Sequence, residues 1–448
     1  MEGAKGLYDI GPSLRSYYES CVTENSCRCG FQASGRSMAI SILSFLANSA
    51  QILFFLAGLF YLFLSFRGFW SIAPPPRARK KLRFALLLPA YNEEKVIRFS
   101  VESLLGIKYP RELFEVFVVA DHCTDDTARI ARGLGARVLE HSFAASKPGK
   151  GRALKWAVSE ILKTGGYDVF CYFDADSLAH PDFLSVMNDH LNAGEEAVQG
   201  RQLSKNTEAW LPRILAAGHI VSNKLFQAPK YACGLSATLH GKGMCFSKRV
   251  TEDFPWDETC LTEDIEMQMR LIRNGVRVTW AENAVVFNEE PVSIRQYVRR
   301  NVRWTRGSMD VAGRHLKGLF ERTVRFLDFN AFEGTLYCGG VYKLGVVVGL
   351  TAALLCVTRD SFVFLFWFYD RLPGSGPALK LMSLSPLALY PAAALVMAKA
   401  GPQMFLAYFL QPVLNILRLP IFVAGLFRGD AFWDRTEHSS GVAITDLV

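Results

Sequence analysis

Hydrophobic residues gather in long stretches with at most one charged side chain near both ends of the chain, whereas the middle alternates apolar and polar positions. The first stretch, Ser37 to Phe66, has no charged side chain, and about 20 apolar residues are enough to cross a bilayer core as a helix. It begins too far from Met1 and is too long for a cleavable signal peptide, and no small-residue cleavage site follows it. We therefore predict a transmembrane helix over residues 37–66, preceded by an N-terminal arm over residues 1–36.

Three more apolar segments follow in the last third of the chain: Gly334 to Val357, Leu381 to Ala398, and Gly401 to Phe427. Pro412 and Pro420 interrupt the last one, and such breaks are tolerated where a membrane helix packs on protein or lines a cavity. The aromatic run Phe362 to Tyr369 is too short to span. These segments predict a C-terminal transmembrane region over residues 334–427 and a tail over residues 428–448. Three crossings would leave the tail outside, and two or four would return it to the cytoplasm.

A basic cluster follows the first apolar stretch. Immediately after Pro74-Pro75-Pro76 come five basic residues within seven positions: Arg77, Arg79, Lys80, Lys81 and Arg83. An excess of Lys and Arg marks the cytoplasmic flank of a transmembrane helix. We therefore expect an integral protein of the cell's inner or plasma membrane, with its N-terminus outside and its central region in the cytoplasm.

The central region, residues 82–293, has the composition of a soluble domain and alternates two kinds of segment. Apolar runs of strand length lie at Leu82–Pro89, Phe114–Ala120 and Val169–Phe173. Stretches with apolar residues at helical spacing lie at Val96–Leu105 and Thr127–Leu134. This order favours an α/β fold with a largely parallel sheet. In such a sheet ligands bind at the carboxyl ends of the strands.

The composition agrees with this division and disfavours several protein classes. The chain has 448 residues and a formal net charge of +8, and 50% of its residues are hydrophobic against 21% charged, so a small disulfide scaffold is excluded. No Cys or His spacing typical of zinc sites occurs. No GxGxxG follows a predicted strand, and Gly149-Lys150-Gly151 lacks the flanking residues of a P-loop. We therefore expect neither a dinucleotide dehydrogenase nor a P-loop NTPase, and no nucleic-acid partner.

Carboxylates follow the predicted strands. Asp121 comes directly after the second apolar run, and Asp174 and Asp176 follow the third. A lone aspartate at such a place often forms a turn or caps a helix, as Asp125 or Asp126 could. Two aspartates two positions apart at a strand end, however, can converge on one cation. Their oxygens, completed by phosphate and water, suit Mg²⁺ or Mn²⁺.

These residues belong to a set of motifs in a fixed order: Pro89–Glu94, Val118–Thr127, Gly149–Leu154, Asp174–Asp176, Thr262–Asp264 and Arg303–Trp304. Together they resemble the inverting family 2 glycosyltransferases, and more closely their membrane-embedded branch, which includes cellulose, chitin, hyaluronan and poly-N-acetylglucosamine synthases. The resemblance covers about Leu82 to Arg306. It implies a GT-A (Rossmann-like) catalytic domain over residues 82–293 between transmembrane helices, and a hexosyltransferase that uses a UDP-sugar donor with Mg²⁺ or Mn²⁺.

The resemblance also implies a role for each matching position. The donor-binding residues would be Tyr91, Glu93, Asp121, Lys150, Asp174 and Arg300. Among these, Asp121 would hold the uracil edge, and Lys150 would lie near uracil or the diphosphate. The metal ligands would be Asp174 and Asp176. The residues beside the acceptor would be Gly241, Gly243 and Trp304, and the catalytic residues Asp264, Arg303 and Trp304.

The chemistry of such a transfer requires few groups. A departing diphosphate gains negative charge, which a divalent cation with Lys150 and Arg303 would stabilise. The acceptor hydroxyl needs one carboxylate to take its proton, and Asp264 is the candidate base. Asp264 could alternatively serve only a helix N-terminus that Thr262 caps, and Trp304 could be an interfacial aromatic near the bilayer.

Two segments beyond these motifs bear on the product. Residues 294–330 combine many arginines with apolar positions, which predicts amphipathic helices at the membrane surface that carry an RxxRW motif. Arg300 stands in this motif where the family usually has Gln, which places an extra positive charge there; the Arg form also occurs in relatives that glycosylate lipids. The tail segment Phe432–His438 resembles the short segment that closes over the donor in this branch.

The expected function is transfer of a sugar from a UDP-sugar onto a growing β-linked polysaccharide or oligosaccharide. Its partners would be the UDP-sugar donor, a polysaccharide or lipid-linked acceptor, and the lipid bilayer. A nonprocessive glycolipid glycosyltransferase acting on a membrane lipid is the alternative, and an inactive nucleotide-sugar sensor or scaffold is a more remote one. The complete set Asp121, Asp174, Asp176 and Asp264 argues against an inactive protein.

Overall fold

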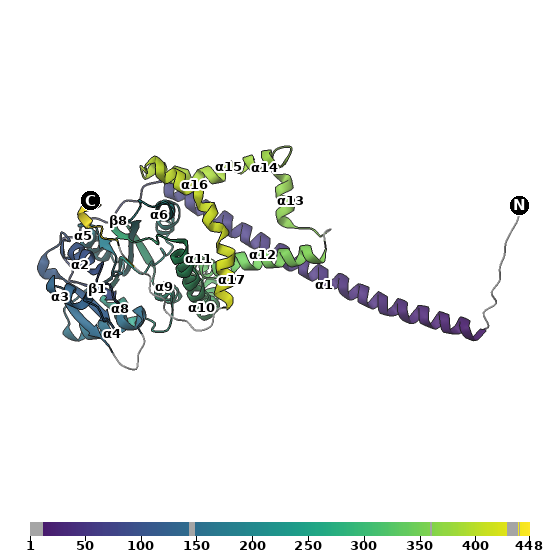
Figure 1. Cartoon of the computed structure of the whole chain (residues 1–448), viewed down its shortest axis with the longest axis horizontal. Coiled ribbons are helices and arrows are strands. Elements are labelled where there is room, and N and C mark those ends of the chain that lie inside the picture. Colours follow the sequence, from purple (N-terminus) through teal and green to yellow (C-terminus); the bar gives the residue numbers. More distant parts are fainter. Residues whose placement is uncertain (1–11, 143–147, 359–360, 428–437, 439) are drawn as a thin grey trace. The chain divides into compact units, whose positions relative to one another are not determined.

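The computed structural model describes residues 12–142, 148–358, 361–427, 438 and 440–448. The chain divides into two compact units, Met1–Leu56 with Val346–Ser375, and Ala57–Gly345 with Gly376–Val448. The second unit contains an eight-stranded sheet with helices on both faces (Figure 1). Its strands are β1 (Phe84–Ala90), β2 (Phe114–Asp121), β3 (Arg137–His141), β4 (Val169–Tyr172), β5 (Leu178–Ala179), β6 (Ala197–Ser204), β7 (Met244–Ser247) and β8 (Val278–Asn288).

The strand order is β3-β2-β1-β4-β7-β6-β8-β5. The first four strands are parallel, with Ala90 of β1 opposite Ala120 of β2, so their carboxyl ends meet at one edge. The other half is mixed, because β7 runs antiparallel to both β4 and β6, whereas β6 and β8 are parallel. The predicted α/β fold is therefore confirmed, and the parallel half brings the residues after β1, β2 and β4 together.

Alternate residues of β1 face two different helical layers, as the two-residue repeat of a strand requires. Leu86 and Leu88 pack in one core with α2 (Ile97–Leu105), α3 (Thr127–Gly133) and α5 (Phe183–Asn192). Ala85 and Leu87 pack in a second core with α4 (Lys150–Thr164), α8 (Lys248–Asp253) and α9 (Glu263–Arg273). β1 is thus buried on both faces, which explains its continuous apolar run.

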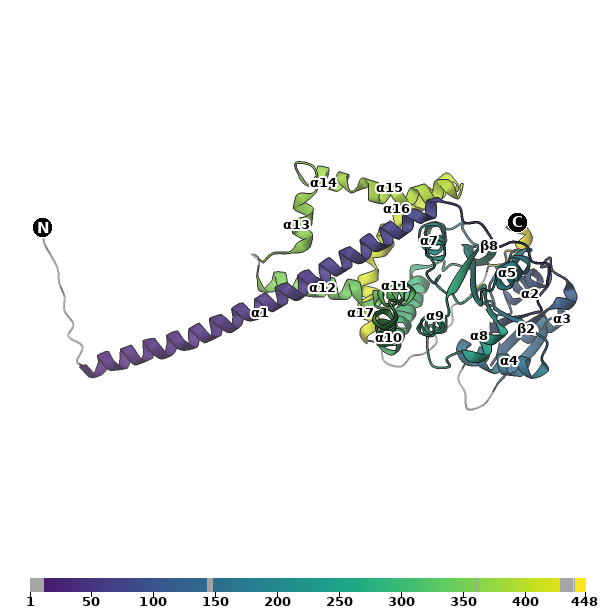
Figure 2. The same cartoon turned by 180° about the vertical axis from the view of Figure 1, so that it is seen from behind.

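A long amphipathic helix follows the sheet. α10 (Ile294–Phe326) packs along α9, α11 (Phe329–Cys338) and α17 (Arg418–Phe427), and α9, α10 and α11 lie side by side in both views (Figure 1 and Figure 2). Val311 and Leu319 of α10 share a core with Met269 and Ile272 of α9. The predicted amphipathic segment 294–330 is therefore mainly one helix, which ends where Leu327 adopts a left-handed backbone conformation with φ of 48°.

The remaining elements are short or belong to the apolar parts of the chain. They are α1 (Pro12–Phe66), α6 (Trp210–Ser222), α7 (Ala228–Ala232), α12 (Gly340–Val357), α13 (Phe364–Arg371), α14 (Pro377–Ser383), α15 (Ser385–Met397), α16 (Pro402–Ile416), a π-helical turn (Asn223–Gln227), and 3₁₀ turns at Arg67–Phe69, Arg111–Leu113 and Ile444–Asp446.

Three helical stretches among the described residues are long and apolar enough to cross a membrane: Ser37–Phe69, Gly340–Val357 and Pro402–Phe427. In each, no more than 17% of the most apolar window is buried inside the protein. The segment Leu381–Ala398 differs from the expectation, because it is divided between α14 and α15 at Leu384. α15 has 13 residues, fewer than the about 20 that a span needs.

Polar side chains of α1 make hydrogen bonds to other helices of the first unit. Asn48 Oδ1 and Gln51 Oε1 accept hydrogen bonds from the backbone N–H groups of Phe364 and Leu365, at 2.7 and 2.9 Å. These are orphan donors in the first turn of α13. Gln51 Nε2 also donates to Thr351 Oγ1 of α12 at 2.9 Å. Polar side chains of α1 thus hydrogen-bond to α12 and to the free donors at the start of α13.

Candidate active site

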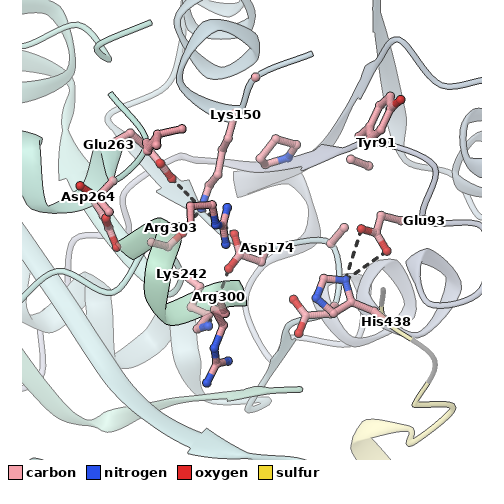
Figure 3. A pocket seen from close by; sticks show the side chains of 18 of the residues that line it. Tyr91, Glu93, Lys150, Asp174, Lys242, Glu263, Asp264, Arg300, Arg303 and His438 are labelled. Carbon is pink, nitrogen blue, oxygen red and sulfur yellow. Dashed lines mark hydrogen bonds and ion pairs between the residues drawn. The ribbon is translucent and has the colours of Figure 1, made fainter. Parts of the chain in front are cut away.

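One pocket lies where the carboxyl ends of the parallel strands meet the start of α10 (Figure 3). The residues that line it are Pro89, Ala90, Tyr91, Glu93, Asp121, Gly149, Lys150, Asp174, Ala175, Asp176, His240, Gly241, Lys242, Leu261, Thr262, Glu263, Asp264, Glu289, Arg300, Arg303, Trp304 and His438. All but one of the residues singled out from the sequence therefore lie together. The exception is Gly243, which has a positive φ of 61° and where a Cβ would lie 2.6 Å from Val286 Cγ2.

Lys150, the first residue of α4, is the centre of an ion-pair network. Its Nζ lies 2.6 Å from Asp174 Oδ1 and 3.1 Å from Glu263 Oε1, and it donates to the Gly241 carbonyl at 2.9 Å. Burial alone would lower the pKa of Lys150, but the Asp174 and Glu263 carboxylates outweigh burial and raise it. Lys150 is therefore a fixed positive charge in the pocket. Figure 3 shows its side chain pointing towards Asp174 and Arg303.

Asp176 is a buried, ionised carboxylate. Its Oδ2 accepts a hydrogen bond from the backbone N–H of Glu289 at 2.9 Å, and Lys205 Nζ donates to its carbonyl oxygen at 2.9 Å. Burial raises the pKa of Asp176, but the positive charges of His438, Lys242 and Lys205 lower it to about 2. Asp176 thus keeps its negative charge at neutral pH.

Asp174 and Asp176 offer oxygens that fit a divalent cation. Both carboxylates line the same pocket, and one or two carboxylates that share the ion with phosphate and water are the usual protein ligands of Mg²⁺. Asp174 is shared between Lys150 and Lys242, the latter at 3.7 Å. Asp176 is bound by one main-chain N–H. The two carboxylates therefore suit Mg²⁺ or Mn²⁺. Asp176 is the better candidate ligand, because its carboxylate has fewer competing partners than that of Asp174.

Asp264 lies at the start of α9 with the properties of a general base. Its Oδ1 accepts from the backbone N–H of Ile265 at 2.9 Å. Burial and the neighbouring Glu263 raise the pKa of Asp264 to about 7, although Lys150 partly opposes them. A side chain with a pKa near the working pH can take and release protons efficiently. Gly241 adopts a positive φ of 76°, and a Cβ there would lie 3.3 Å from Asp264 Oδ2.

The first turn of α9 also corrects one expectation. Thr262 occupies the N-cap position, but its side chain makes no capping hydrogen bond. The reason is a close approach of α10, because a Cβ on Gly307 would lie 2.5 Å from Thr262 Cγ2. Thr262 therefore packs against α10, and this contact fixes α9, which carries Asp264, relative to the helix that carries Arg303.

α10 supplies Arg300, Arg303 and Trp304. Arg300 Nη2 donates to Glu290 Oε2 at 2.8 Å, and Arg300 Cζ lies 4.6 Å from the centroid of the Trp304 ring. Arg303 is partly buried near Glu263 and Asp174, and this burial lowers its pKa, against the effect of these carboxylates. Trp304 also lines a second cavity, whose other residues are Ile265, Asn301, Thr305, Ser308, Val311, Tyr337, Cys338 and Val341.

The C-terminal tail contributes one pocket residue, His438, which is the last residue of the predicted closing segment Phe432–His438. His438 Nδ1 lies 3.2 Å from both carboxylate oxygens of Glu93, and Ser440 N–H donates to Glu289 Oε2 at 3.0 Å. Ile444 and Leu447 pack beside the small core that contains Phe287. Residues 432–437 of the predicted closing segment lie outside the described residues, so its role stays a prediction. Burial would lower the pKa of His438, but Asp176 and Glu93 raise it to about 9.

Three further charged residues of the pocket were given no role from the sequence, although two of them stand inside or between the motif residues. These are Lys242, Glu263 and Glu289. Glu263 stands beside Asp264 in sequence, and its adjacency to a predicted base was a usable signal. Lys242 lies between the two predicted glycines. Glu289 directly follows the end of β8, just as the predicted carboxylates follow the ends of other strands.

Sequence reasoning also missed two histidines around Asp121. Asp121 Oδ1 lies 2.6 Å from His122 Nδ1 and 2.7 Å from His141 Nδ1, and its Oδ2 accepts from Gly149 N–H at 2.8 Å. The candidate ligand atoms of these three side chains lie within 4.8 Å of one another, so the group could also hold a metal ion. The signal was available, since His141 ends β3 next to β2, which ends at Asp121.

Comparison with known proteins identifies the class of enzyme that this fold and pocket define. Residues 82–307, half of the chain, match the model of the glycosyltransferase-like family 2. The chain therefore belongs to this family, as the motifs predicted.

Two curated relatives resemble the central part of the chain. One is the probable glycosyltransferase YdaM of Bacillus subtilis, 26% identical over 260 residues, which are 56% of this chain and 61% of that protein. Another is the poly-β-1,6-N-acetyl-D-glucosamine synthase of Staphylococcus aureus, 24% identical over 231 residues, 50% of this chain and 54% of that protein. The match thus spans less than two thirds of either relative.

A solved structure shares the fold. The mannosyltransferase PcManGT from Pyrobaculum calidifontis, in complex with GDP-Man and Mn²⁺, superposes with a TM-score of 0.51 at 18% sequence identity. The likeness covers 86% of this chain and 97% of the mannosyltransferase. The GT-A fold predicted from the motifs is confirmed.

Proposed function

We propose that this chain is a membrane-bound, inverting glycosyltransferase that moves a sugar from a UDP-sugar onto a growing β-linked polysaccharide or oligosaccharide. The observation that carries the proposal is the position of Asp264, a carboxylate with a pKa of about 7, in one pocket with Asp174, Asp176, Lys150 and Arg303. An inactive sensor would not need a carboxylate with a raised pKa in this pocket.

The residues of the pocket divide into two functions. Lys150 and Arg303 would stabilise the charge that develops on the departing diphosphate, because preformed charges in a buried site act strongly on it. Asp264 would take the proton of the acceptor hydroxyl as it attacks the sugar. One base suffices for inversion, since the leaving diphosphate is already a stable anion.

A divalent cation fits the donor side of this pocket. Asp176, assisted by Asp174, would hold it, and the ion would supply further charge stabilisation for the diphosphate. The resident Mn²⁺ of the Pyrobaculum mannosyltransferase complex supports this assignment. Lys242, 3.7 Å from Asp174, would help to hold the same negatively charged group.

The acceptor would approach from the side of Trp304. This ring lines both the pocket and the second cavity, where Asn301 and Ser308 offer polar groups beside Ile265 and Val341. An aromatic face with polar neighbours suits a sugar ring. The name of the Staphylococcus aureus relative supports a polysaccharide product, whereas Arg300 in place of Gln favours the alternative, a lipid acceptor.

The apolar helices support a membrane location. The segments Ser37–Phe69, Gly340–Val357 and Pro402–Phe427 have the length and composition of spans. The basic residues that follow Pro74–Pro76 would place the catalytic domain in the cytoplasm, by the excess of positive charge typical of that side. Reaction of an impermeant label with a cysteine introduced in this basic segment only after permeabilisation would support the orientation.

Product analysis tests the proposal. The purified full chain, with Mn²⁺ and a panel of UDP-sugars, should release UDP and form a ladder of β-linked products; Asp264→Asn is the matched inactive control. A single monoglycosylated, chloroform-soluble product would select the glycolipid alternative. No UDP release from any donor of the panel would contradict the proposed function.

A further inference from the structure

The bonds around Asp121 limit what its carboxylate can still bind. A carboxylate has about four lone-pair positions, two on each oxygen, and only accepts hydrogen bonds. Both His122 and His141 therefore present a protonated Nδ1 to the same oxygen, Oδ1. Gly149 N–H occupies one position on Oδ2. Counting the bonds made by the described residues, one acceptor position is left, and it is on Oδ2.

The fold holds this arrangement firmly. Asp121 and His141 are neighbours in the parallel pairing of β2 and β3, and His122 N–H donates to the His141 carbonyl at 2.8 Å. His122 adopts a left-handed backbone with φ of 52°, a conformation that persists where the surrounding structure maintains it. The His141 ring lies 5.0 Å from the ring of Trp156 and 5.5 Å from that of His122. Both imidazoles are thus fixed on Asp121.

A single remaining acceptor distinguishes nucleobases. The Watson–Crick edge of uracil carries one N–H donor between two carbonyl oxygens. The same edge of guanine carries two adjacent donors, N1–H and the exocyclic amino group, which a carboxylate accepts with both of its oxygens. With Oδ1 of Asp121 already used twice, a guanine would bury one donor without a partner, and a buried unpaired donor is strongly disfavoured.

We propose that His122 and His141 determine nucleotide specificity by restricting Asp121 to one further hydrogen bond, so that the pocket takes a uracil nucleotide and rejects a guanine nucleotide. This inference rests on the proposed function with its UDP-sugar donor, and on the sequence resemblance, which implies that Asp121 holds the uracil edge. The two histidines act through Asp121 and are therefore positioning residues.

Binding of UDP and GDP, each with Mn²⁺, to the purified full chain tests the inference. The variants are His122→Gly, in which glycine adopts the left-handed backbone freely, and His141→Phe, which keeps a ring against Trp156. His180→Asn, outside the pocket, is the matched control. The wild type and the control should bind UDP at least about tenfold more tightly than GDP. Each variant should lower this ratio roughly tenfold, or about 1.4 kcal/mol, because Oδ1 regains an acceptor position.

The ratio separates specificity from a merely structural role, since a structural defect weakens UDP and GDP binding together. An unchanged ratio in His122→Gly, with UDP still bound, would overturn the inference and leave the proposed function standing. A wild type that prefers GDP, or whose three-residue cluster binds Zn²⁺ or Mn²⁺ in competition with UDP, would overturn it as well. A wild type that binds neither nucleotide would overturn both.

Discussion

The guanidinium of Arg300 lies over the ring of Trp304, with Cζ 4.6 Å from the ring centroid, while its Nη2 donates to Glu290 at 2.8 Å. Glu290 is buried and also binds His219 Nε2 at 2.8 Å. Burial raises the pKa of Glu290, but Arg300 and His219 outweigh it and lower the pKa, so Glu290 is a carboxylate. The positive charge that Arg300 adds to the motif is therefore balanced by Glu290, which lies between β8 and α10, and the face of the guanidinium packs on Trp304.

The sequence predicted Arg300 as a donor-binding residue, but its stacking on Trp304 leads us to expect that replacing it acts on the acceptor side. Arg300→Gln removes the stacked cation, which contributes about 0.5–2 kcal/mol in such contacts, and should reduce transfer about tenfold through a mobile Trp304. UDP affinity should change less than about threefold. Steady-state kinetics and UDP titration of wild type and Arg300→Gln measure both. A loss of UDP affinity equal to the loss of rate would instead show that Arg300 binds the donor.

The same pair of proteins tests the length of the product. Size-resolved products from wild type should form a ladder, because the ring that Arg300 supports would keep the acceptor in place after each addition. Arg300→Gln should give shorter products even though Gln is the usual residue of the family, because in this chain the stacked guanidinium supports Trp304. Monoglycosylated lipid alone from both proteins would contradict the polymer assignment.

The pKa of Asp264 predicts the pH dependence of transfer. Because the base must be deprotonated, turnover should rise with pH and level off above about pH 7, the value set by burial and Glu263. Glu263→Gln removes a negative charge that raises this pKa, so the rising limb should move to lower pH. Initial rates measured from about pH 5.5 to 9 give the profile. If the rising limb of the pH profile stays at the same pH in Glu263→Gln, the charge of Glu263 does not raise the pKa of Asp264.

The parallel half of the sheet was predictable from the sequence. The apolar runs that form β1, β2 and β4 are buried on both faces, as is typical of parallel strands. Because parallel strands end at the same edge of a sheet, the polar residues that follow them lie together. This placed Asp121, Asp174 and Asp176 together. The resemblance to known motifs added Asp264 and the start of α10, which no local pattern would have joined to the sheet.

Other parts of the site depend on long-range packing that local patterns do not encode. His438 reaches Glu93 across 345 positions of the chain, and its approach is set by the packing of Ile444 and Leu447. Thr262 has the right residue type for a cap, but the contact with Gly307 directs it elsewhere. The break at Leu384 likewise interrupts a segment whose composition alone predicted a continuous span.

Removal of the metal should stop turnover. EDTA should abolish UDP release, and added Mn²⁺ should restore it, because Asp176 and Asp174 would hold an ion that stabilises the diphosphate. Asp176→Asn should lose most activity yet fold normally, since an amide oxygen can still accept the Glu289 N–H bond. Asp182→Asn, an exposed acid away from the pocket, is the control. Unchanged UDP release in the presence of chelator would contradict the metal assignment.

The role of Asp264 is tested most directly by comparing binding and turnover in Asp264→Asn. This variant keeps the shape of the side chain and its acceptor for Ile265 N–H, but it cannot take a proton. UDP affinity, measured by titration with Mn²⁺, should stay within about threefold of wild type, while transfer should fall by roughly 10² or more. A loss of UDP affinity as large as the loss of rate would contradict the account, because Asp264 would then support the structure of α9 rather than the chemistry.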